Sequence, residues 1–342
     1  MDIPKPALES LREKLKKTEQ QLPPDLLEKA ESLLSVSDAA SLESLSRYIE
    51  ILTLIPFDNA TEDTLDINRA KQVLDKNHYA LSEVKDRILE YLSSLILNLE
   101  KGRNSSETPI LCLVGLAGTG KTTLASSMAE SLGRIFERIP FGGIGDVTSV
   151  RGQSRSLPNA EPGLIVKKLI HAKSKNPVIL LDEIDRVVDV SRADIMGVFL
   201  EVLDPAQNMA FLDHYVDYPI DLSKVLFVAT ANNPTNISTA VLDRLEVIQM
   251  PSYSDEEKMS IGKNYLFPKI VERCGLDKGQ IVFDETAWQT IIRPLGFDSG
   301  IRSLERTLEG IARKVARKIV EGSLNKNAII RIDSTNVKEF IA

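Results

Sequence analysis

The stretch Ile110–Leu124, which reads ILCLVGLAGTGKTTL, constrains the fold more than any other part of the chain. An apolar, β-prone run leads into a segment that matches the pattern GxxxxGK[ST] at every fixed position. Its glycines let the backbone curl so that successive N–H groups point at an anion, and a helix that begins near Lys121 adds its positive N-terminal end. The stretch therefore predicts a strand, a phosphate-binding loop and a helix. A chance glycine-rich turn is disfavoured because a helical pattern follows at Leu124, Met128 and Leu132.

Each position of this loop has an expected part in holding nucleotide phosphates. The Lys121 ammonium is expected on the β- and γ-phosphates, and the Thr122 hydroxyl is expected to take one position on Mg²⁺. The predicted nucleotide-binding residues are Gly115, Leu116, Ala117, Gly118, Thr119, Gly120, Lys121, Thr122 and Thr123.

Length and composition are those of an ordinary globular protein. The 342 residues suggest two or three domains, each large enough to bury a core. Lys and Arg total 42 against 49 Asp and Glu, so the net charge of -7 gives no global basic field for nucleic acid or a membrane. No apolar run reaches the length of a membrane span, and the N-terminus MDIPKPALES lacks signal-peptide features. A cytoplasmic location is expected, or an organelle matrix if an address has been removed.

The helical and strand patterns divide the chain into three expected segments. Residues 1–75 form an N-terminal helical segment and linker, residues 76–251 an α/β nucleotide-binding domain, and residues 252–342 a small helical lid domain. The first segment carries leucine stripes at helical spacing, as at Leu11 and Leu15. These stripes are expected to be helix–helix packing faces, with a coiled arm that binds a partner as the alternative.

The middle segment alternates strands with helices. Its strands are continuously apolar, which is typical of strands buried on both faces of a parallel sheet between helical layers. The expected strands are Ile110–Val114, Ile135–Ile139, Val178–Leu181, Val225–Ala231 and Glu246–Met250. The expected fold class is thus α/β, a P-loop type of parallel five-stranded sheet sandwiched by helices.

The last segment changes to helical patterns. A helix interrupted by Pro268 is expected first, and a long helix is expected from Ser299 to Glu321. Two short strands, Ile281–Phe283 and Ile329–Ile332, are expected between the helices.

Acidic residues follow the third expected strand, where the chain reads VILLDEID. Because doubly wound sheets bind ligands at the carboxyl ends of their strands, Asp182 is expected to reach Mg²⁺ and Glu183 to polarise the attacking water. Two solvated surface acids are the alternative, which the phosphate loop upstream makes the weaker one.

Three polar residues further along complete the candidate site. Asn232 ends the fourth expected strand, where an amide can hold the attacking water or touch the γ-phosphate. Arg244 is a candidate arginine finger, a cation that one subunit supplies to its neighbour, and Arg302 begins a lid helix from which it can reach the γ-phosphate. Without wider context, Asn232 reads as a turn residue and both arginines as surface salt-bridge residues.

Taken together, these segments resemble a known family. The chain is similar to the ATPase module of Lon proteases, AAA+ machines that unfold proteins and thread them into a peptidase chamber. The resemblance is carried by GLAGTGKTT, ILLDEID, FLEVLDPAQNMAFLDHYVDYPIDLSKVLFVATANN, VLDRLEVIQMPSYSDEEK and GIRSLER. It runs through essentially the whole chain and includes part of the family's N-terminal helical region.

The resemblance implies a role for each matched residue. The implied catalytic residues are Glu183 to activate water, Asn232 as a sensor, Arg244 as the finger from a neighbouring subunit and Arg302 as the lid sensor. Thr122 and Asp182 are the implied Mg²⁺ ligands, and the implied nucleotide is ATP. His78 and Tyr79 match the segment that lines the family's adenine pocket.

The chain departs from the family pattern in three places. The family continues into a peptidase domain with a Ser–Lys dyad, whereas these residues end at Ala342, so no peptidase is assigned to them; the chain is either a fragment or a naturally shortened relative. Leu157 and Pro158 stand where the substrate-gripping pore loop has an aromatic and then an aliphatic residue, and leucine lacks the stacking surface of an aromatic ring. Leu116-Ala117 replace two prolines at positions that need only backbone shape.

The expected function is that of an Mg-ATP-dependent protein unfoldase and translocase module of a Lon-type protease, acting in protein quality control. Such a module would hydrolyse ATP at the subunit interfaces of a homohexameric ring and thread unfolded or damaged protein through a central pore. A nucleotide-binding scaffold or switch without translocation is one alternative. A DNA-remodelling AAA+ ATPase is another, and the net charge of -7 argues mildly against it.

Overall fold

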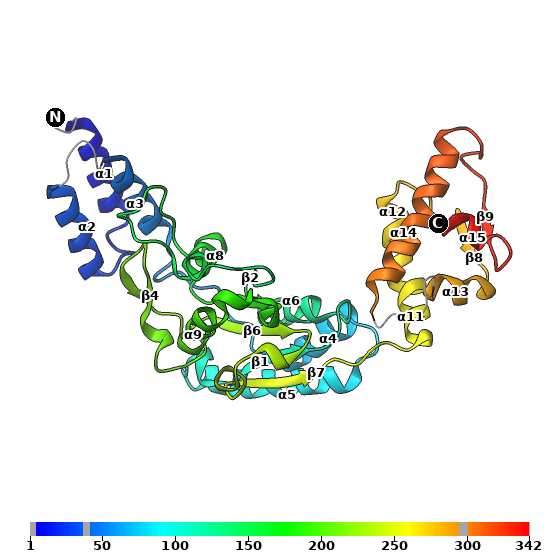
Figure 1. Ribbon diagram of the computed structural model, residues 1–342, viewed down its shortest axis with the longest axis horizontal. Coiled ribbons are helices and arrows are strands. Elements are labelled where there is room, and N and C mark those ends of the chain that lie inside the picture. Colours follow the sequence, from blue (N-terminus) through cyan, green and yellow to red (C-terminus); the bar gives the residue numbers. More distant parts are fainter. Residues whose placement is uncertain (1–4, 37–41, 294–299, 342) are drawn as a thin grey trace. The chain divides into compact units, whose positions relative to one another are not determined.

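The computed structural model describes residues 5–36, 42–293 and 300–341 (Figure 1). The chain divides into two compact units. The first comprises residues 1–77, 83–114 and 122–248, and the second comprises residues 78–82, 115–121 and 249–342.

The first unit is built on a five-stranded sheet with the strand order β2-β3-β6-β1-β7. Within it, β2 pairs with β3, β3 with β6 and β6 with β1, all in parallel. The strands are β1 (Ile110–Val114), β2 (Phe136–Pro140), β3 (Val178–Asp182), β6 (Leu226–Ala231) and β7 (Leu245–Gln249). The predicted α/β class and its strands are confirmed; β1 has the expected bounds, and the other strands begin or end one residue away from them.

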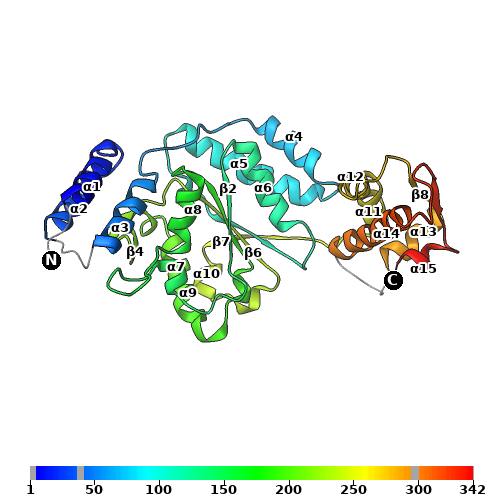
Figure 2. The same ribbon diagram turned by 90° about the horizontal axis from the view of Figure 1, so that it is seen from above.

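Helices cover both faces of this sheet. A right-handed crossover requires helices that lead toward opposite edges to lie on opposite faces. Helix α6 (Lys121–Leu132) leads from β1 to the β2 edge, whereas α8 (Leu164–Ala172) and α9 (Arg192–Val202) lead back across β3 and β6. Figure 2 accordingly shows α6 and α5 (Ser82–Glu100) on one side of the sheet and α8 and α9 on the other.

The remaining elements of this unit are short, apart from the helices α1 to α4. The hairpin of β4 and β5, whose strands have three residues each, is missing from the sequence expectations. The bounds are α1 (Lys5–Lys17), α2 (Pro24–Val36), α3 (Leu42–Leu54), α4 (Ile67–Asn77), η1 (Ser105–Glu107), α7 (Thr148–Arg151), η2 (Ile184–Arg186), η3 (Asp189–Ser191), η4 (Asn208–Ala210), β4 (Phe211–Asp213), β5 (Tyr218–Ile220), η5 (Pro234–Asn236) and α10 (Thr239–Leu242).

The N-terminal helices share a core with the sheet. Leu15 of α1, Leu26 of α2 and Leu52 of α3 are at most 1 % exposed. They belong to one apolar cluster with Cys112 of β1 and Phe199 of α9. The predicted packing role of the leucine stripes is therefore confirmed for these side chains, which are buried within the chain.

A buried ion pair fixes the connector that follows α3. The Arg134 guanidinium, with a side chain only 1 % exposed, donates from Nε and Nη2 to the two Asp63 carboxylate oxygens, both at 2.7 Å. Asn176 donates to the Thr61 carbonyl at 2.9 Å and accepts from the Thr61 N–H at 2.8 Å. These contacts hold the segment between α3 and α4 against the α/β core.

The second unit contains the lid helices and a two-stranded parallel sheet of β8 and β9. Its helical run begins with a capping box in which Ser254 and Glu257 bond to each other's backbone N–H groups. The run stays helical through Pro268 by way of a π turn, which corrects the expected interruption. The bounds are α11 (Asp255–Ile261), η6 (Gly262–Leu266), α12 (Phe267–Arg273), β8 (Ile281–Phe283), α13 (Glu285–Ile292), α14 (Arg302–Val320), β9 (Ile330–Ile332) and α15 (Val337–Phe340). Ser299, the expected start of the long helix, lies outside the described residues.

A substitution at Leu308 tests the packing of the lid core. Leu308 is fully buried on α14, in the same cluster as Trp288, the only tryptophan of the chain. Leu308→Ala should lower the free energy of unfolding by about 2–5 kcal/mol, since it leaves a cavity. Urea unfolding followed by Trp288 fluorescence measures this change. Val320→Ala, at an 87 % exposed position of the same helix, should stay within about 0.5 kcal/mol. Equal shifts for the two variants would contradict the described packing.

Candidate functional site

Asp182 lies at the carboxyl end of β3, between groups from both neighbouring strands. The parallel register places Leu181 beside Ala229, so the next residues along, Asp182 and Thr230, are also neighbours. The Thr230 hydroxyl donates to Asp182 Oδ1, and Arg138 of β2 donates from Nε to Asp182 Oδ2 at 2.6 Å. The Asp182 carboxylate is 3 % exposed and is held in place by these two donors.

Glu183 follows Asp182 in a left-handed backbone conformation, with φ of 57°. Its N–H donates to the Thr230 hydroxyl at 2.9 Å, so one threonine supports both acids. The Glu183 carboxylate lies beside Arg186 at 3.4 Å and over Gly142, where an added Cβ would come within 2.8 Å of Glu183 Oε2. A residue held at positive φ at a strand end is typical of a functional site, because the surrounding structure must impose that conformation.

Asn232 lies at the end of β6, next to these acids. The Asn232 N–H donates to Asp185 Oδ1 at 3.1 Å, and the Asn233 N–H donates to Asp185 Oδ2 at 3.0 Å. Asp185 is 5 % exposed and therefore connects the segment after β3 to the end of β6. The first unit thus brings Asp182, Glu183 and Asn232 to one edge of its sheet, as the sequence predicts.

The phosphate loop has the curled backbone that its glycines predict. Gly118 and Gly120 have φ of 82° and 95°, values that residues with a Cβ rarely adopt. The Lys121 ammonium is 7 % exposed and donates to the carbonyls of Gly115 at 2.6 Å and Leu116 at 3.0 Å. Thr122 and Thr123 follow in the first turn of α6. A buried ammonium inside a curled glycine loop fits the phosphates of a nucleotide.

The start of α14 packs directly on this loop within the second unit. The Ile301 N–H donates to the Gly118 carbonyl at 3.1 Å. An added Cβ on Gly300 would overlap the Ala117 carbonyl oxygen and lie 3.0 Å from Gly118 Cα. Arg302 is the first residue of α14 and is exposed. The second unit therefore brings the start of α14, with Arg302, to the loop that carries Lys121.

The candidate adenine residues lie among tyrosines of the same unit. His78 is buried and Tyr79 is 38 % exposed, with its ring centroid 6.0 Å from that of Tyr265 in the π turn. The Tyr253 hydroxyl donates to the Thr119 carbonyl at 3.3 Å. Burial raises the pKa of Tyr253 to about 12, so this hydroxyl stays protonated and remains a donor at neutral pH.

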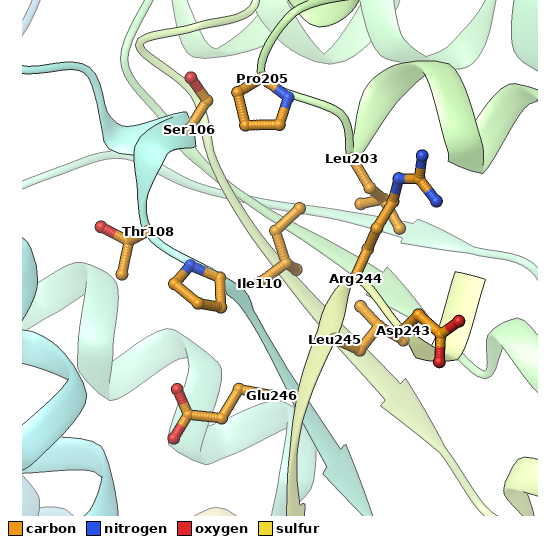
Figure 3. A pocket seen from close by; sticks show the side chains of 10 residues that line it. Ser106, Thr108, Ile110, Leu203, Pro205, Asp243, Arg244, Leu245 and Glu246 are labelled. Atoms are coloured by element: carbon orange, nitrogen blue, oxygen red, sulfur yellow. The ribbon is translucent and has the colours of Figure 1, made fainter. Parts of the chain in front are cut away.

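Arg244 lies at a cavity of about 490 Å³ in the first unit (Figure 3). Apolar side chains of Ile110, Leu203 and Leu245 form part of its lining. Arg244 donates to Asp204 at 3.1 Å and to the Ala240 carbonyl at 2.9 Å. The Ala206 N–H, and after it the Arg244 guanidinium, hold the pKa of Asp204 below its usual value. In the single chain Arg244 is therefore an ion-paired residue at the rim of a groove, apart from the edge that carries Asp182.

The candidate pore loop carries Leu157 in an exposed position. The Leu157 side chain is 54 % exposed, and the chain turns through Asn159, which has φ of 56°. Pro158 lies between them and is also exposed.

Comparison with known proteins agrees with both parts of this geometry. Residues 111–253 match the model of the ATPase family associated with various cellular activities (AAA), and residues 272–328 match that of the Lon protease AAA+ ATPase lid domain. The chain has the ATPase module of the Lon protease family.

Full-length relatives extend this Lon-type match to almost the whole chain. It is 44 % identical over 331 residues to the Lon protease of Dictyoglomus thermophilum, covering 95 % of this chain and 41 % of the relative. It is 40 % identical over 341 residues to that of Halothermothrix orenii, covering 100 % of this chain and 41 % of the relative. For that of Clostridioides difficile it is 43 % identical over 324 residues, with coverage of 93 % and 40 %. The chain thus spans about two fifths of the length of the curated relatives it matches.

Sequence reasoning missed four residues that shape the Lon-type site. Arg138 and Thr230 hold Asp182, Asp185 ties β3 to β6, and Tyr265 lies beside Tyr79. The Thr230 hydroxyl inside the fully buried β6 was an available signal, because such a group rarely lies in a buried strand without a partner. Arg138 gives no such signal, since its side chain is 48 % exposed. Tyr265 carries no such signal.

Gly300 tests the contact between α14 and the phosphate loop. Gly300→Ala should weaken binding of a fluorescent ATP analogue about tenfold to a hundredfold, because a displaced loop loses charge-assisted hydrogen bonds worth about 1.5–3 kcal/mol. Gly310→Ala is the matched control, since an added Cβ there meets nothing within 4 Å. It should leave affinity unchanged and stabilise α14 by about 0.5–1 kcal/mol. Unchanged affinity in Gly300→Ala would contradict the described contact.

Proposed function

We propose that this chain is the ATP-driven unfoldase and translocase module of a Lon-type protease. The module hydrolyses Mg-ATP at the subunit interfaces of a homohexameric ring and pulls unfolded or damaged protein through a central pore. The observation that carries the proposal is the acidic edge of the sheet, where Thr230 fixes Asp182 and Glu183 together at the end of β3. Residues 1–75 serve as its N-terminal helical segment, residues 76–251 as its nucleotide-binding domain and residues 252–342 as its lid.

In this proposal the phosphate loop and β3 hold Mg-ATP. Lys121 and the loop N–H groups bind the phosphates, and the Thr122 hydroxyl and the Asp182 carboxylate hold Mg²⁺, which neutralises phosphate charge. The oxygens of Thr122 and Asp182 fit Mg²⁺, because this ion typically binds one or two protein oxygens together with substrate phosphates and water. His78 and Tyr79 form part of the adenine pocket, beside Tyr265.

Glu183 acts as the base for the attacking water. The water oxygen bonds to the γ-phosphorus while the bond to the β,γ-bridging oxygen breaks, so that ADP leaves and the water proton passes to the Glu183 carboxylate. Asn232 orients the water. The negative charge that spreads over the γ-phosphate oxygens is stabilised by Arg302 of the same chain and by Arg244 of a neighbouring copy, which leaves Asp204 on assembly.

The pore-loop proposal depends on the exposed Leu157. Its aliphatic side chain offers apolar surface to an extended polypeptide, although less than an aromatic ring would. Across the described residues no helix is both long and apolar enough to cross a membrane. The relatives identified above are named proteases, and in this proposal the threaded protein would be cleaved by an assembled Lon-type protease that contains this module.

An unfolded protein tests this function directly. Reduced and carboxymethylated lactalbumin should stimulate steady-state ATP turnover several-fold, and Leu157→Ala should remove the stimulation while basal turnover stays within about twofold, because Leu157 contacts only the threaded chain. Glu183→Gln should lower turnover at least about a hundredfold with ATP binding retained, since it removes a general base.

Other outcomes of this assay favour different functions. ATP binding without stimulated turnover in the parent chain would support a nucleotide-dependent switch instead. Stimulation by DNA, lost as salt is raised, would support a DNA-remodelling ATPase. Unchanged turnover in Glu183→Gln would contradict the role of Glu183.

A further inference from the structure

The two ends of the loop that carries Leu157 lie close together within the first unit. The Gln153 N–H donates to the Glu161 carbonyl at 3.0 Å, which closes the base of the loop. The Gly163 N–H then donates to Asp213 Oδ2 at 2.7 Å, and the same carboxylate accepts from the N–H groups of Tyr215 and Val216. Asp213 is fully buried, so the return end of the loop is fixed to the β4–β5 hairpin.

The outgoing end of the loop rests on α3. The Arg155 guanidinium lies over the Tyr48 ring, with its carbon 3.9 Å from the ring centroid. Tyr48 cannot move away easily, because its side chain is fully buried and its hydroxyl donates to the Val216 carbonyl at 3.0 Å. The Arg155 side chain is only 26 % exposed, so this cation–π contact is partly shielded from water.

The returning end of the loop contacts the preceding residue of the same helix. Arg47 of α3 forms an ion pair with Glu161 at 2.8 Å. Lys167 of α8 pairs with the same carboxylate at 2.6 Å, and Lys167 first and Arg47 second lower the pKa of Glu161. Successive residues of α3 thus hold the two ends of the loop that presents Leu157.

We call the contacts of Arg47 and Tyr48 with the two ends of the loop the clamp. A further contact extends this clamp to α2. Lys29 donates to Asp217 Oδ2 at 2.6 Å and also to the Asp217 carbonyl, and Arg155 lies 3.9 Å from the same carboxylate. In both views α3 lies beside β4 (Figure 1 and Figure 2). Asp217 lies in the connection between β4 and β5. The N-terminal helices therefore contact the hairpin and the loop as one surface.

We propose that Arg47 and Tyr48 of α3 are positioning residues for the loop that carries Leu157, so that the N-terminal helices set how this loop meets a polypeptide. The consequence for grip rests on the proposed threading function, whereas the clamp itself does not. Neither α3 residue touches the substrate; each acts through a charged residue of the loop, Tyr48 through Arg155 and Arg47 through Glu161.

Each contact is modest, and the two act on one loop. A partly shielded cation–π pair and a half-exposed ion pair each shift an equilibrium by about twofold to fivefold. Loss of either should therefore raise the population of loosened loop by about that factor. The fold of the unit should survive, because Asp213 and the Gln153–Glu161 bond still close the loop.

A nitroxide spin label at residue 157 tests the clamp without reference to activity. The background is Leu157→Cys with Cys274→Ser in the full chain, in which the remaining Cys112 is fully buried. Arg155→Ala and Arg47→Ala should each raise the mobile fraction of the spectrum about twofold to fivefold. Tyr48→Phe keeps the ring under Arg155 and should keep the spectrum. Arg87→Ala, which removes an exposed ion pair with Glu246 elsewhere in the unit, is the matched control.

ATPase measurements on chains that keep Leu157 test whether the clamp affects the response to an unfolded protein. Arg155→Ala and Arg47→Ala should raise the concentration of carboxymethylated lactalbumin needed for half-stimulation about twofold to fivefold, with basal turnover unchanged and the melting temperature lowered by no more than about 4 °C.

The outcomes separate the two proposals. Spectra identical to the parent in both arginine variants would overturn the clamp. Altered spectra with normal stimulation, in a protein where Leu157→Ala abolishes stimulation, would overturn its role in grip. Altered spectra in a protein where Leu157→Ala has no effect would support the clamp and contradict the threading function.

Discussion

The parallel pairing of β3 with β6 is the constraint on which the acidic edge of the site depends. Its register places Asp182 beside Thr230, and one hydroxyl then serves the carboxylate of Asp182 and the N–H of Glu183. Asp185 repeats this connection one step further, because it accepts N–H groups from the end of β6. A carboxylate buried in this way is stable only when donors surround it. The strand order of the sheet therefore determines which acidic residues are fixed in position at the carboxyl ends of the strands.

Two further sets of contacts hold other candidate functional segments, each within its own unit. In the second unit, Gly300 lacks a side chain where α14 meets the phosphate loop, so the helix that begins with Arg302 stays in register with Lys121. In the first unit, α3 holds the loop of Leu157 through Arg155 and Glu161. The N-terminal helices thus pack into the apolar core of the α/β unit, and they contact the loop through charged side chains.

The sequence allowed local features to be predicted well. A curled loop at Gly118 and Gly120, buried parallel strands and acids at a strand end all follow from short-range pattern and steric rules. Contacts between distant segments were out of reach, among them Arg138 with Asp182 and Arg155 with Tyr48, since one sequence does not reveal which charged residues meet. The π turn before Pro268 was missed for a related reason, because Gly262 of this turn packs closely on Trp288, a contact between segments that are distant in the sequence.

The central claim is that ATP is hydrolysed at sites completed by a neighbouring copy, and mixing two inactive variants tests it. Arg244→Ala keeps its own Glu183, and Glu183→Gln keeps its own Arg244. If fingers act between copies, co-refolding the two in equal amounts should restore about one quarter of parent turnover, because a random site has both groups with that frequency. Turnover that stays at the mean of the two separate variants would contradict the account, since Arg244 would then not serve a neighbour.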